Sequence, residues 1–169
     1  IIKEELQRAR PGFGLILEES GKEVGRDKED FWIVDPLDGT MNFLHGLPHF
    51  AISIAHESKG EILSGVIFDP LRNEIFYSVK GRGAYSNDGR IRVSNRKELN
   101  DSVFSTGIPC IGKDRHPAYL KILDDMMKRS AGIRRFGAAS LDLAYVAAGR
   151  YEGFWETDLK YWDVAAGSL

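Results

Sequence analysis

The stretch FWIVDPLDGTMNF (residues 31–43) places an apolar run directly before two aspartates that a proline and a leucine separate. FWIV is typical of a buried strand, and DPLDGT is typical of the turn that leaves such a strand. Asp35 would then lie at the strand end, and Asp38 would return to the same side. Two carboxylates held this close repel each other, so the pattern indicates a positive partner that stabilises both.

The residue types favour divalent cations as that partner. Asp35, Asp38 and an outward-turned carbonyl of Leu37 are hard oxygen ligands, which suit Mg²⁺ or Mn²⁺ better than zinc. Gly39 allows close approach of the backbone, and Thr40 is placed to cap the short helix TMNFLHG. The free N–H groups at the start of that helix would favour a phosphate beside the cations.

Two further acidic segments bear on this interpretation. LEES places Glu18 and Glu19 at another predicted strand end, and WDVAAG places Asp163 at a predicted helix start. Taken singly, each segment has a plainer explanation: Glu18 as a solvated edge charge, Asp163 as an N-cap, and DPLDGT as a turn of common turn-forming residues. Taken together, the three segments favour one gathered acidic site.

The rest of the chain predicts a mixture of strands and helices. The strands are predicted at residues 13–20, 31–34, 50–57, 61–70, 73–81, 83–86, 90–94, 101–108 and 153–157. The helices are predicted at residues 1–10, 116–130 and 138–150, with Gly149 ending the third and Asp163 capping a last one. Residues 21–30 are predicted to form a loop. Without strict βαβ alternation, this order favours an α/β (α+β) layered sandwich.

Composition narrows the class of protein. The chain has 169 residues and a formal net charge of −2, so nucleic acid is not indicated as a partner. No apolar run approaches the roughly 20 residues of a membrane span. The single Cys110 favours a reducing compartment, and with no neighbouring histidine it is predicted to be a packed thiol. Because the chain opens mid-helix without Met and closes on a barely begun helix, we expect residues 1–169 to be one domain that is incomplete at both ends.

These motifs resemble the inositol monophosphatase family, within the wider group of metal-dependent, lithium-sensitive sugar and nucleotide phosphatases. WIVDPLDGTMNF (residues 32–43) and WDVAAG (residues 162–167) carry the resemblance, and GVIFDP, GRGAYSNDG and IRRFGAASLDLAYVAAG follow the family in order and spacing. The resemblance implies a layered αβαβα sandwich of the inositol monophosphatase/fructose-1,6-bisphosphatase type. It also implies a cytoplasmic, homodimeric hydrolase.

The resemblance further implies specific roles at the site. One metal ion would be bound by Glu18, Asp35 and the Leu37 carbonyl, and a second by Asp35, Asp38 and Asp163, with two or three Mg²⁺ ions in all and Mn²⁺ as an alternative. Glu18 and Thr40 would be catalytic, orienting the attacking water. The residues implied to contact substrate are Glu18, Leu37, Asp38, Gly39, Thr40, Arg134, Gly137, Ala138, Ala139, Glu156 and Asp163.

The leading functional hypothesis is therefore Mg²⁺-dependent hydrolysis of a small polyol phosphate, with myo-inositol monophosphate the first substrate to test. Related sugar or nucleotide (bis)phosphatases of the same group remain alternatives, as does a non-catalytic regulatory protein with this fold. Aspartyl-phosphate phosphatases also end a motif in DGT. Their aspartates are separated by one residue, whereas Asp35 and Asp38 are separated by two, so a nucleophile and acid would be misplaced.

Overall fold

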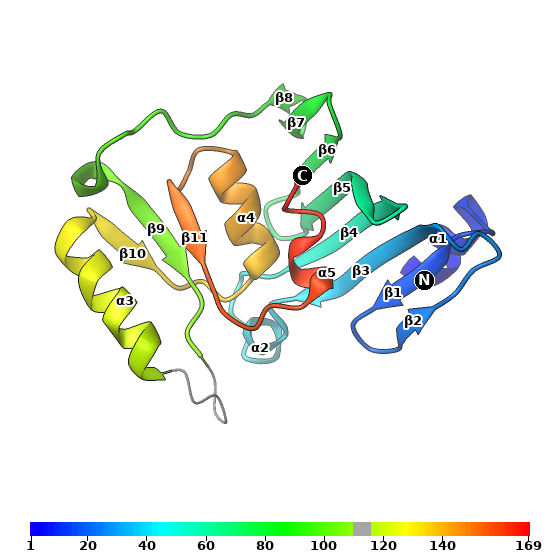
Figure 1. Cartoon of the computed structure of the whole chain (residues 1–169), viewed down its shortest axis with the longest axis horizontal. Helices are drawn as coiled ribbons and strands as arrows, with labels where there is room; N and C mark the ends of the chain where they lie inside the picture. The colour runs from blue at the N-terminus through cyan, green and yellow to red at the C-terminus, as the bar shows by residue number, and fades with distance from the viewer. Residues whose placement is uncertain (110–115) are drawn as a thin grey trace.

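The computed structural model describes residues 1–109 and 116–169 (Figure 1). Cys110, predicted to be a packed thiol, lies outside the described residues. The larger of two sheets has eight strands in the order β2-β1-β3-β4-β5-β6-β7-β8. These strands are β1 (Gly14–Leu17), β2 (Gly21–Glu23), β3 (Asp30–Asp38), β4 (Ala51–Ser58), β5 (Glu61–Asp69), β6 (Glu74–Val79), β7 (Gly83–Ser86) and β8 (Gly89–Arg90).

The smaller sheet has three parallel strands in the order β10-β9-β11. They are β9 (Val103–Thr106), β10 (Gly132–Arg134) and β11 (Gly153–Trp155). The helices are α1 (Ile2–Ala9), α2 (Thr40–Leu44), α3 (His116–Arg129), α4 (Ala139–Ala147) and α5 (Tyr161–Val164), with a 3₁₀ turn at Leu99–Asp101.

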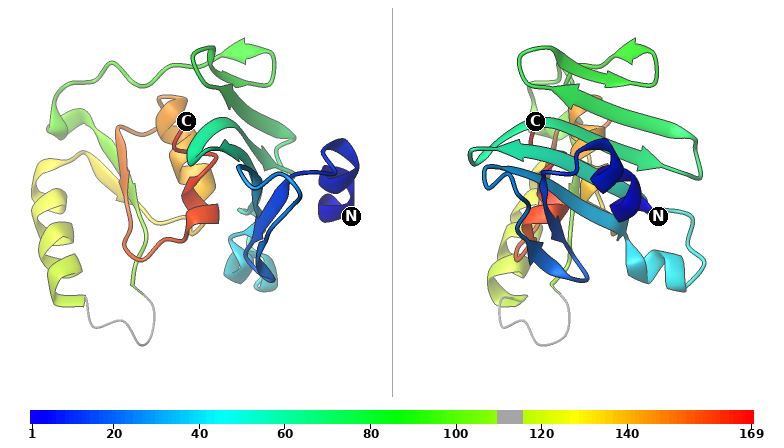
Figure 2. Two further views of the ribbon diagram at one scale, coloured as in Figure 1. Left: turned by 45° about the vertical axis from the view of Figure 1, so that its right-hand side comes forward. Right: turned by 90° about the vertical axis from the view of Figure 1, so that its right-hand side faces the viewer.

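The elements form five layers, as expected (Figure 2). Helices α4 and α5 lie between the sheets, because α4 contacts β5 and β11 while α5 contacts β3 and β4. Helix α3 packs on the outer side of the small sheet against β10. Helix α1 lies on the opposite face of the large sheet, where Ile2 and Val34 line a cavity of about 680 Å³. The order is thus α1, large sheet, α4 with α5, small sheet, α3.

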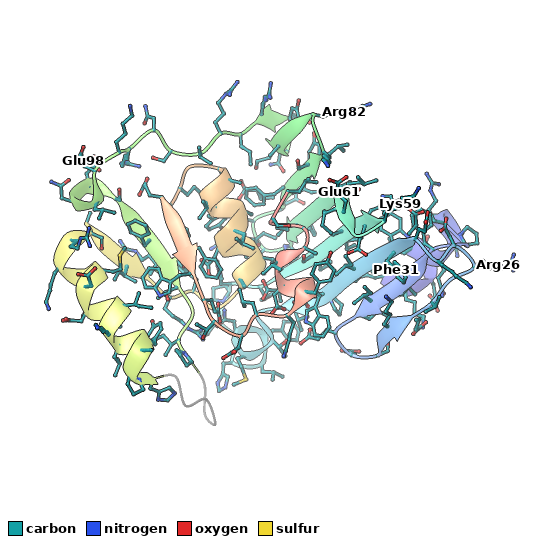
Figure 3. The ribbon with its side chains drawn as sticks, in the orientation of Figure 1. Arg26, Phe31, Lys59, Glu61, Arg82 and Glu98 are labelled. Carbon is teal, nitrogen blue, oxygen red and sulfur yellow. The ribbon has the colours of Figure 1, made fainter. Side chains whose placement is uncertain are left out.

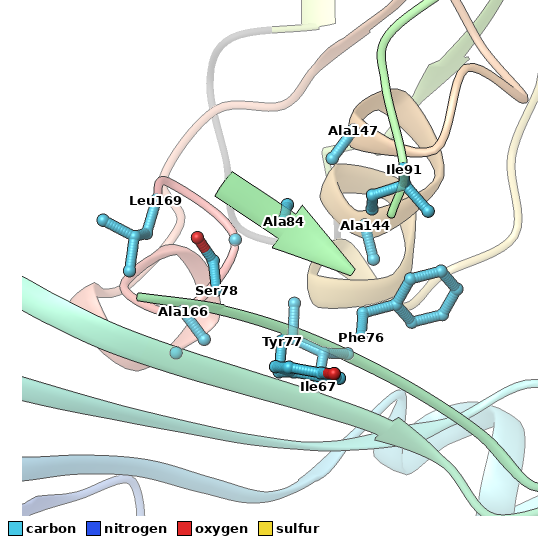
Figure 4. Close-up of a pocket in the computed structure, with 12 residues that line it drawn as sticks. Ile67, Phe76, Tyr77, Ser78, Ala84, Ile91, Ala144, Ala147, Ala166 and Leu169 are labelled. Atoms are coloured by element: carbon cyan, nitrogen blue, oxygen red, sulfur yellow. The ribbon is translucent and has the colours of Figure 1, made fainter. Parts of the chain in front are cut away.

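Alternation along β3 explains how the large sheet faces two layers. Ile33 belongs to the inner core with Leu141 of α4 and Ala165 after α5, whereas its neighbour Val34 faces α1. The inner packing is close, and only about 30 Å³ of cavity remains where Ile67 and Phe76 meet the middle layer (Figure 4). Successive side chains of β3 point to opposite faces of the sheet, and helices cover both faces. This explains why all four residues of FWIV are apolar.

The strand pairing positions the ends of β1 and β3 at one edge. β1 pairs with β3 in parallel, and Leu17 lies opposite Val34. Every other pair in the large sheet is antiparallel, and the strands from β3 to β8 pair in chain order as a meander. Glu18, which follows β1, and Asp35, which lies within β3, therefore come side by side where the parallel pairing ends.

Several predicted strands differ from those in the structure. Gly21–Glu23, predicted as loop, forms β2 through backbone pairing with β1, which needs no apolar signal. β3 does not end before DPLD but continues to Asp38 with a shift in register between Asp35 and Asp38. The predicted strand at residues 90–94 is reduced to Gly89–Arg90, and β10 was not predicted. Gly149 does end α4, with φ at 71°.

Surface charges of both signs lie close together at the hairpin tips of the large sheet. Lys59 and Glu61 flank the β4–β5 turn, and Arg82 lies at the β6–β7 turn (Figure 3). Lys80 forms an ion pair with Glu61 on this surface. Such mixing does not create the basic stripe typical of a nucleic-acid surface. Among the described residues, no helix has the length and apolar character needed to cross a membrane.

Candidate active site

The irregular end of β3 orients the two aspartates. Asp35 and Asp38 are 2% and 9% exposed. The Leu37 N–H donates a hydrogen bond to Asp35 Oδ1 (2.9 Å), which closes a local turn around Pro36. The Thr40 hydroxyl donates to the Leu37 carbonyl (2.9 Å). These two bonds fix the Asp35 carboxylate and the Leu37 carbonyl around one short loop.

The acids predicted from three separate segments line one polar cleft of about 180 Å³. Its lining residues are Glu18, Asp35, Leu37, Asp38, Gly39, Thr40, Arg135, Gly137, Ala139, Glu156, Leu159 and Asp163. Of the predicted site residues, only Arg134 and Ala138 are missing from this set. The cleft thus gathers every position that the resemblance implies for metal binding and water orientation.

The carboxylates of the cleft are electrostatically strained. The pKa of Asp35 is raised to about 8, chiefly by burial and then by repulsion from Asp38, with Glu18 adding to the effect. Burial also raises the pKa of Asp38 to about 6, although hydrogen bonds from Ser140 oppose this. Burial raises the pKa of Asp163 as well. A bound cation would favour the ionised forms of these carboxyls and so lower their pKa values.

The donor set fits a hard cation. Among residues 1–109 and 116–169, no three His, Cys, Asp or Glu side chains already stand close enough together to hold a metal ion by themselves. Mg²⁺ commonly keeps several waters, so its site does not need to be a preformed all-protein cage. The Leu37 carbonyl at the same cleft adds an oxygen that is not a side chain.

Ser140 holds one oxygen of Asp38 in place. The Ser140 N–H donates to Asp38 Oδ2 at 2.7 Å, and the Ser140 hydroxyl donates to the same oxygen at 2.5 Å. Ser140 is fully buried in the first turn of α4. Asp38 Oδ2 is thereby committed to the start of α4, and the Ala139 backbone also stabilises the ionised Asp38 carboxylate. Sequence analysis did not identify Ser140. Within GAAS, it assigned only Gly137, Ala138 and Ala139, as residues implied to contact substrate.

Ser140→Ala is expected to weaken divalent-cation affinity about 10-fold, since supporting bonds to metal ligands typically contribute that much. The backbone N–H bond to Asp38 persists, so the fold should be kept. Mn²⁺ binding to the substrate-free protein, followed by electron paramagnetic resonance, measures the effect. Ser105→Ala is the matched control, because Ser105 donates to the buried Asp142 at 2.6 Å. Equal Mn²⁺ affinity in wild type and Ser140→Ala would contradict the assignment.

Gly39, rather than Thr40, precedes the first turn of α2. Gly39 is the N-cap and has φ at 89°, a left-handed conformation. A Cβ there would lie 3.0 Å from the carbonyl oxygen of His49. The prediction that Thr40 caps the helix is therefore wrong: Thr40 is its first residue, and its hydroxyl turns back to Leu37. This keeps the Thr40 side chain on the cleft.

Asp163 likewise lies inside its helix. Lys160 is the N-cap of α5, so the predicted N-cap role of Asp163 is wrong. Asp163 instead accepts a hydrogen bond from the Lys160 N–H at 2.6 Å with its Oδ2.

Glu156, which follows β11, lines the same cleft. Burial raises the pKa of Glu156, and Arg135 opposes this rise.

The structure brings Arg135, not the predicted Arg134, to the cleft. Arg134 is exposed at the end of β10 and donates to the adjacent Ile133 carbonyl. Arg135 has no hydrogen-bond or ion-pair partner among the described residues, and it folds over Gly137, where a Cβ would lie 2.3 Å from its Nη1. Neighbouring side chains in an extended segment point to opposite sides, so only one of the two arginines can face the cleft. The sequence of a basic pair does not show which one does.

An acidic cleft of this kind, at the edge of an αβαβα sandwich, defines a site suited to hard cations and anionic ligands. The chain belongs to the inositol monophosphatase family, whose model matches residues 1–169. It is 56% identical over 169 residues to the inositol-1-monophosphatase of Rhizobium meliloti (strain 1021), covering 100% of this chain and 64% of that relative.

A solved structure and a second curated relative, both named suhB or SuhB, are also similar to this chain. The crystal structure of extragenic suppressor protein suhB from Bartonella henselae superposes with a TM-score of 0.96 at 54% identity, over 98% of this chain and 64% of that one. The Nus factor SuhB of Pasteurella multocida is 45% identical over 168 residues, which are 99% of this chain and 63% of that relative. The chain therefore spans about 64% of the length of the two curated inositol-1-monophosphatases from Rhizobium meliloti and Mesorhizobium japonicum.

Proposed function

We propose that the protein is a Mg²⁺-dependent, lithium-sensitive phosphomonoesterase that releases phosphate from a small polyol phosphate, with myo-inositol monophosphate as the first substrate to test. The observation that carries the proposal is the meeting of Glu18, Asp35, Asp38 and Asp163 at one cleft. The similarity to inositol-1-monophosphatases supports it. On the family resemblance, we also expect a cytoplasmic homodimer.

Two sets of ligands are proposed at the cleft. Glu18, Asp35 and the Leu37 carbonyl would hold one ion, and Asp35, Asp38 and Asp163 would hold a second. At these residues Mg²⁺ would supply Lewis-acid chemistry, lowering the pKa of a bound water and neutralising charge on the phosphate. Because these carboxylates repel one another without a cation, ion binding and ionisation of Asp35 are coupled.

The protein's own groups would orient the reactants. The hydrogen of the Thr40 hydroxyl is committed to the Leu37 carbonyl, so the lone pairs of its oxygen are available to accept a hydrogen bond from water. The Glu18 carboxylate would accept the other hydrogen of that water. The backbone at Gly39 and Thr40 would contact the phosphate, while Gly137, Ala138 and Ala139 would let the substrate approach the backbone.

The leaving alcohol would face Glu156. A carboxylate accepts hydrogen bonds only, which matches the hydroxyl groups of a polyol. Arg135 lies on the same cleft and opposes the rise in the Glu156 pKa. In this scheme water attacks phosphorus directly and gives up a proton, the ester P–O bond breaks, and the leaving alkoxide takes up a proton to become the alcohol. No side chain becomes phosphorylated.

Phosphate release by the whole protein from inositol, sugar and nucleotide phosphates, with and without Mg²⁺, tests the proposal. We expect Mg²⁺-dependent release that is fastest on inositol monophosphate and is inhibited by Li⁺. Trapping of a phosphorylated aspartate, or release that ignores both Mg²⁺ and Li⁺, would contradict it.

A regulatory function is the second candidate, because some relatives are named Nus factor SuhB. The variant Asp38→Asn separates the two. Partner binding that survives this substitution, together with no hydrolysis by the wild-type protein, would favour regulation over catalysis.

A further inference from the structure

Gly107 and Glu156 lie side by side beyond the ends of two strands. β9 and β11 run parallel, and Thr106 pairs with Trp155. The next residue on each strand is Gly107 on one side and Glu156 on the other. The Gly107 N–H donates to the Trp155 carbonyl at 3.2 Å, which fixes the two chain segments at this point.

The absence of a side chain at Gly107 makes the room that the Glu156 carboxyl occupies. A Cβ added to Gly107 would lie 1.9 Å from Glu156 Cδ and 2.1 and 2.2 Å from its two oxygens. These are the three heavy atoms nearest to such a Cβ, and real Cβ atoms essentially never approach another heavy atom within 3.0 Å. Gly107 is itself buried.

Backbone conformation does not account for this glycine. Gly107 is not among the glycines with positive φ, whereas Gly39 and Gly137 are. An alanine could therefore adopt its backbone angles without strain, and the conflict would fall on the far end of the flexible Glu156 side chain. The carboxyl would have to move by about 1 Å or more, a shift that is known to matter at substrate-orienting groups.

We propose that Gly107 is a positioning residue that sets the place of the Glu156 carboxylate and so selects phosphate esters whose alcohol carries hydroxyl groups. The inference rests on the proposed function, in which Glu156 accepts hydrogen bonds from those hydroxyls. Gly107 touches no reacting atom. It acts by leaving space beside the cleft, and this space is lost when any side chain is added.

The test is a double-mutant cycle between Gly107→Ala and Glu156→Ala in the whole protein. Two substrates are compared: myo-inositol 1-phosphate, which carries hydroxyls, and p-nitrophenyl phosphate, which carries none on its leaving group. Gly107→Ala is expected to raise KM for the inositol ester about 10-fold, the usual effect of losing a hydrogen bond to a charged group, with little change in kcat. The constants for p-nitrophenyl phosphate should change less than about 2-fold.

Glu156→Ala should cause a similar loss of preference, and adding Gly107→Ala to it should cause no more. Gly89→Ala is the control, because its Cβ would come no closer than 3.6 Å to Ser86 and Gly89 has no positive φ. If Gly107→Ala alone fails to fold, Glu156→Ala should restore the fold, since the clash is with that side chain.

Three results would overturn the inference. Gly107→Ala could weaken kcat/KM equally for both substrates, or it could leave the preference for the inositol ester over p-nitrophenyl phosphate unchanged. It could also raise KM for the inositol ester as much in the Glu156→Ala background as in wild type. A wild-type protein that hydrolyses neither substrate would give a different pattern. That result would refute the proposed function itself, and the inference would fall with it.

Discussion

Asp35→Asn is expected to abolish Mg²⁺-dependent phosphate release while it raises the thermal stability of the metal-free protein. Asp35 contributes to both proposed ion sites, and the loss of Lewis-acid chemistry worth several kcal/mol corresponds to a rate lower by about 1,000-fold or more. The same carboxyl is 2% exposed and has a pKa raised to about 8 by burial and by Asp38. Asparagine removes the cost of either burying the ionised carboxyl or binding a proton to it, so the folded state should gain stability when no cation is present.

The matched control is Asp142→Asn. Asp142 is also buried, with a pKa that burial raises to about 7, but it is bonded to Ser105 in the inner layer and does not line the cleft. This variant should also keep or raise the melting temperature without cation, yet retain Mg²⁺-dependent turnover. Near-wild-type turnover in Asp35→Asn would refute the ligand assignment, whatever its stability.

The second large effect concerns pH. Without divalent cations, the protein should lose stability as pH rises from about 4 toward 8. The folded-state pKa of Asp35 lies at about 8 and that of Asp38 at about 6, both above the ordinary value of 3.8. Between these limits the folded state binds more protons than the unfolded state, so the free energy of unfolding falls with rising pH. The stability is fully present below the unfolded pKa and is lost through the folded pKa.

Melting curves at pH 5 and pH 8, each with EDTA or with Mg²⁺, measure this effect. In EDTA we expect the melting temperature at pH 8 to be lower by about 5 °C or more than at pH 5. Mg²⁺ should restore most of the difference at pH 8, because it binds the ionised acids of the folded state. Asp35→Asn should flatten the pH dependence in EDTA. A melting temperature that rises from pH 5 to pH 8 in wild type, with no flattening in the variant, would contradict the electrostatic assignment.

The parts of the fold that sequence predicted are those with a strong apolar signal. The strands from β4 to β7 and helices α3 and α4 follow side-chain periodicity, which depends on burial. β2 and β10 were missed, because short edge strands are held by backbone hydrogen bonds that any residue can form. Periodicity also did not predict that β3 continues past Pro36 to Asp38, since a register shift has no apolar pattern.

At the site, motifs identified the cleft-lining acids but not their supports. DPLDGT and WDVAAG are local in sequence, and the acids they contain do meet at one cleft. Ser140, Arg135 and Gly107 act through neighbours that are distant in the chain, and their roles depend on which way one side chain points. The direction of a side chain depends on tertiary contacts, which local sequence patterns do not specify.

The parallel pairing of β1 with β3 has a consequence for the order of assembly. Glu18 and Asp35 come together as soon as those strands pair, but Asp163 arrives only when α5 docks on β3 and β4. Closing so long a loop is entropically costly and comes late in folding. The complete set of cation ligands therefore exists only in the folded protein. Cation binding is expected to stabilise the folded state and not to nucleate folding.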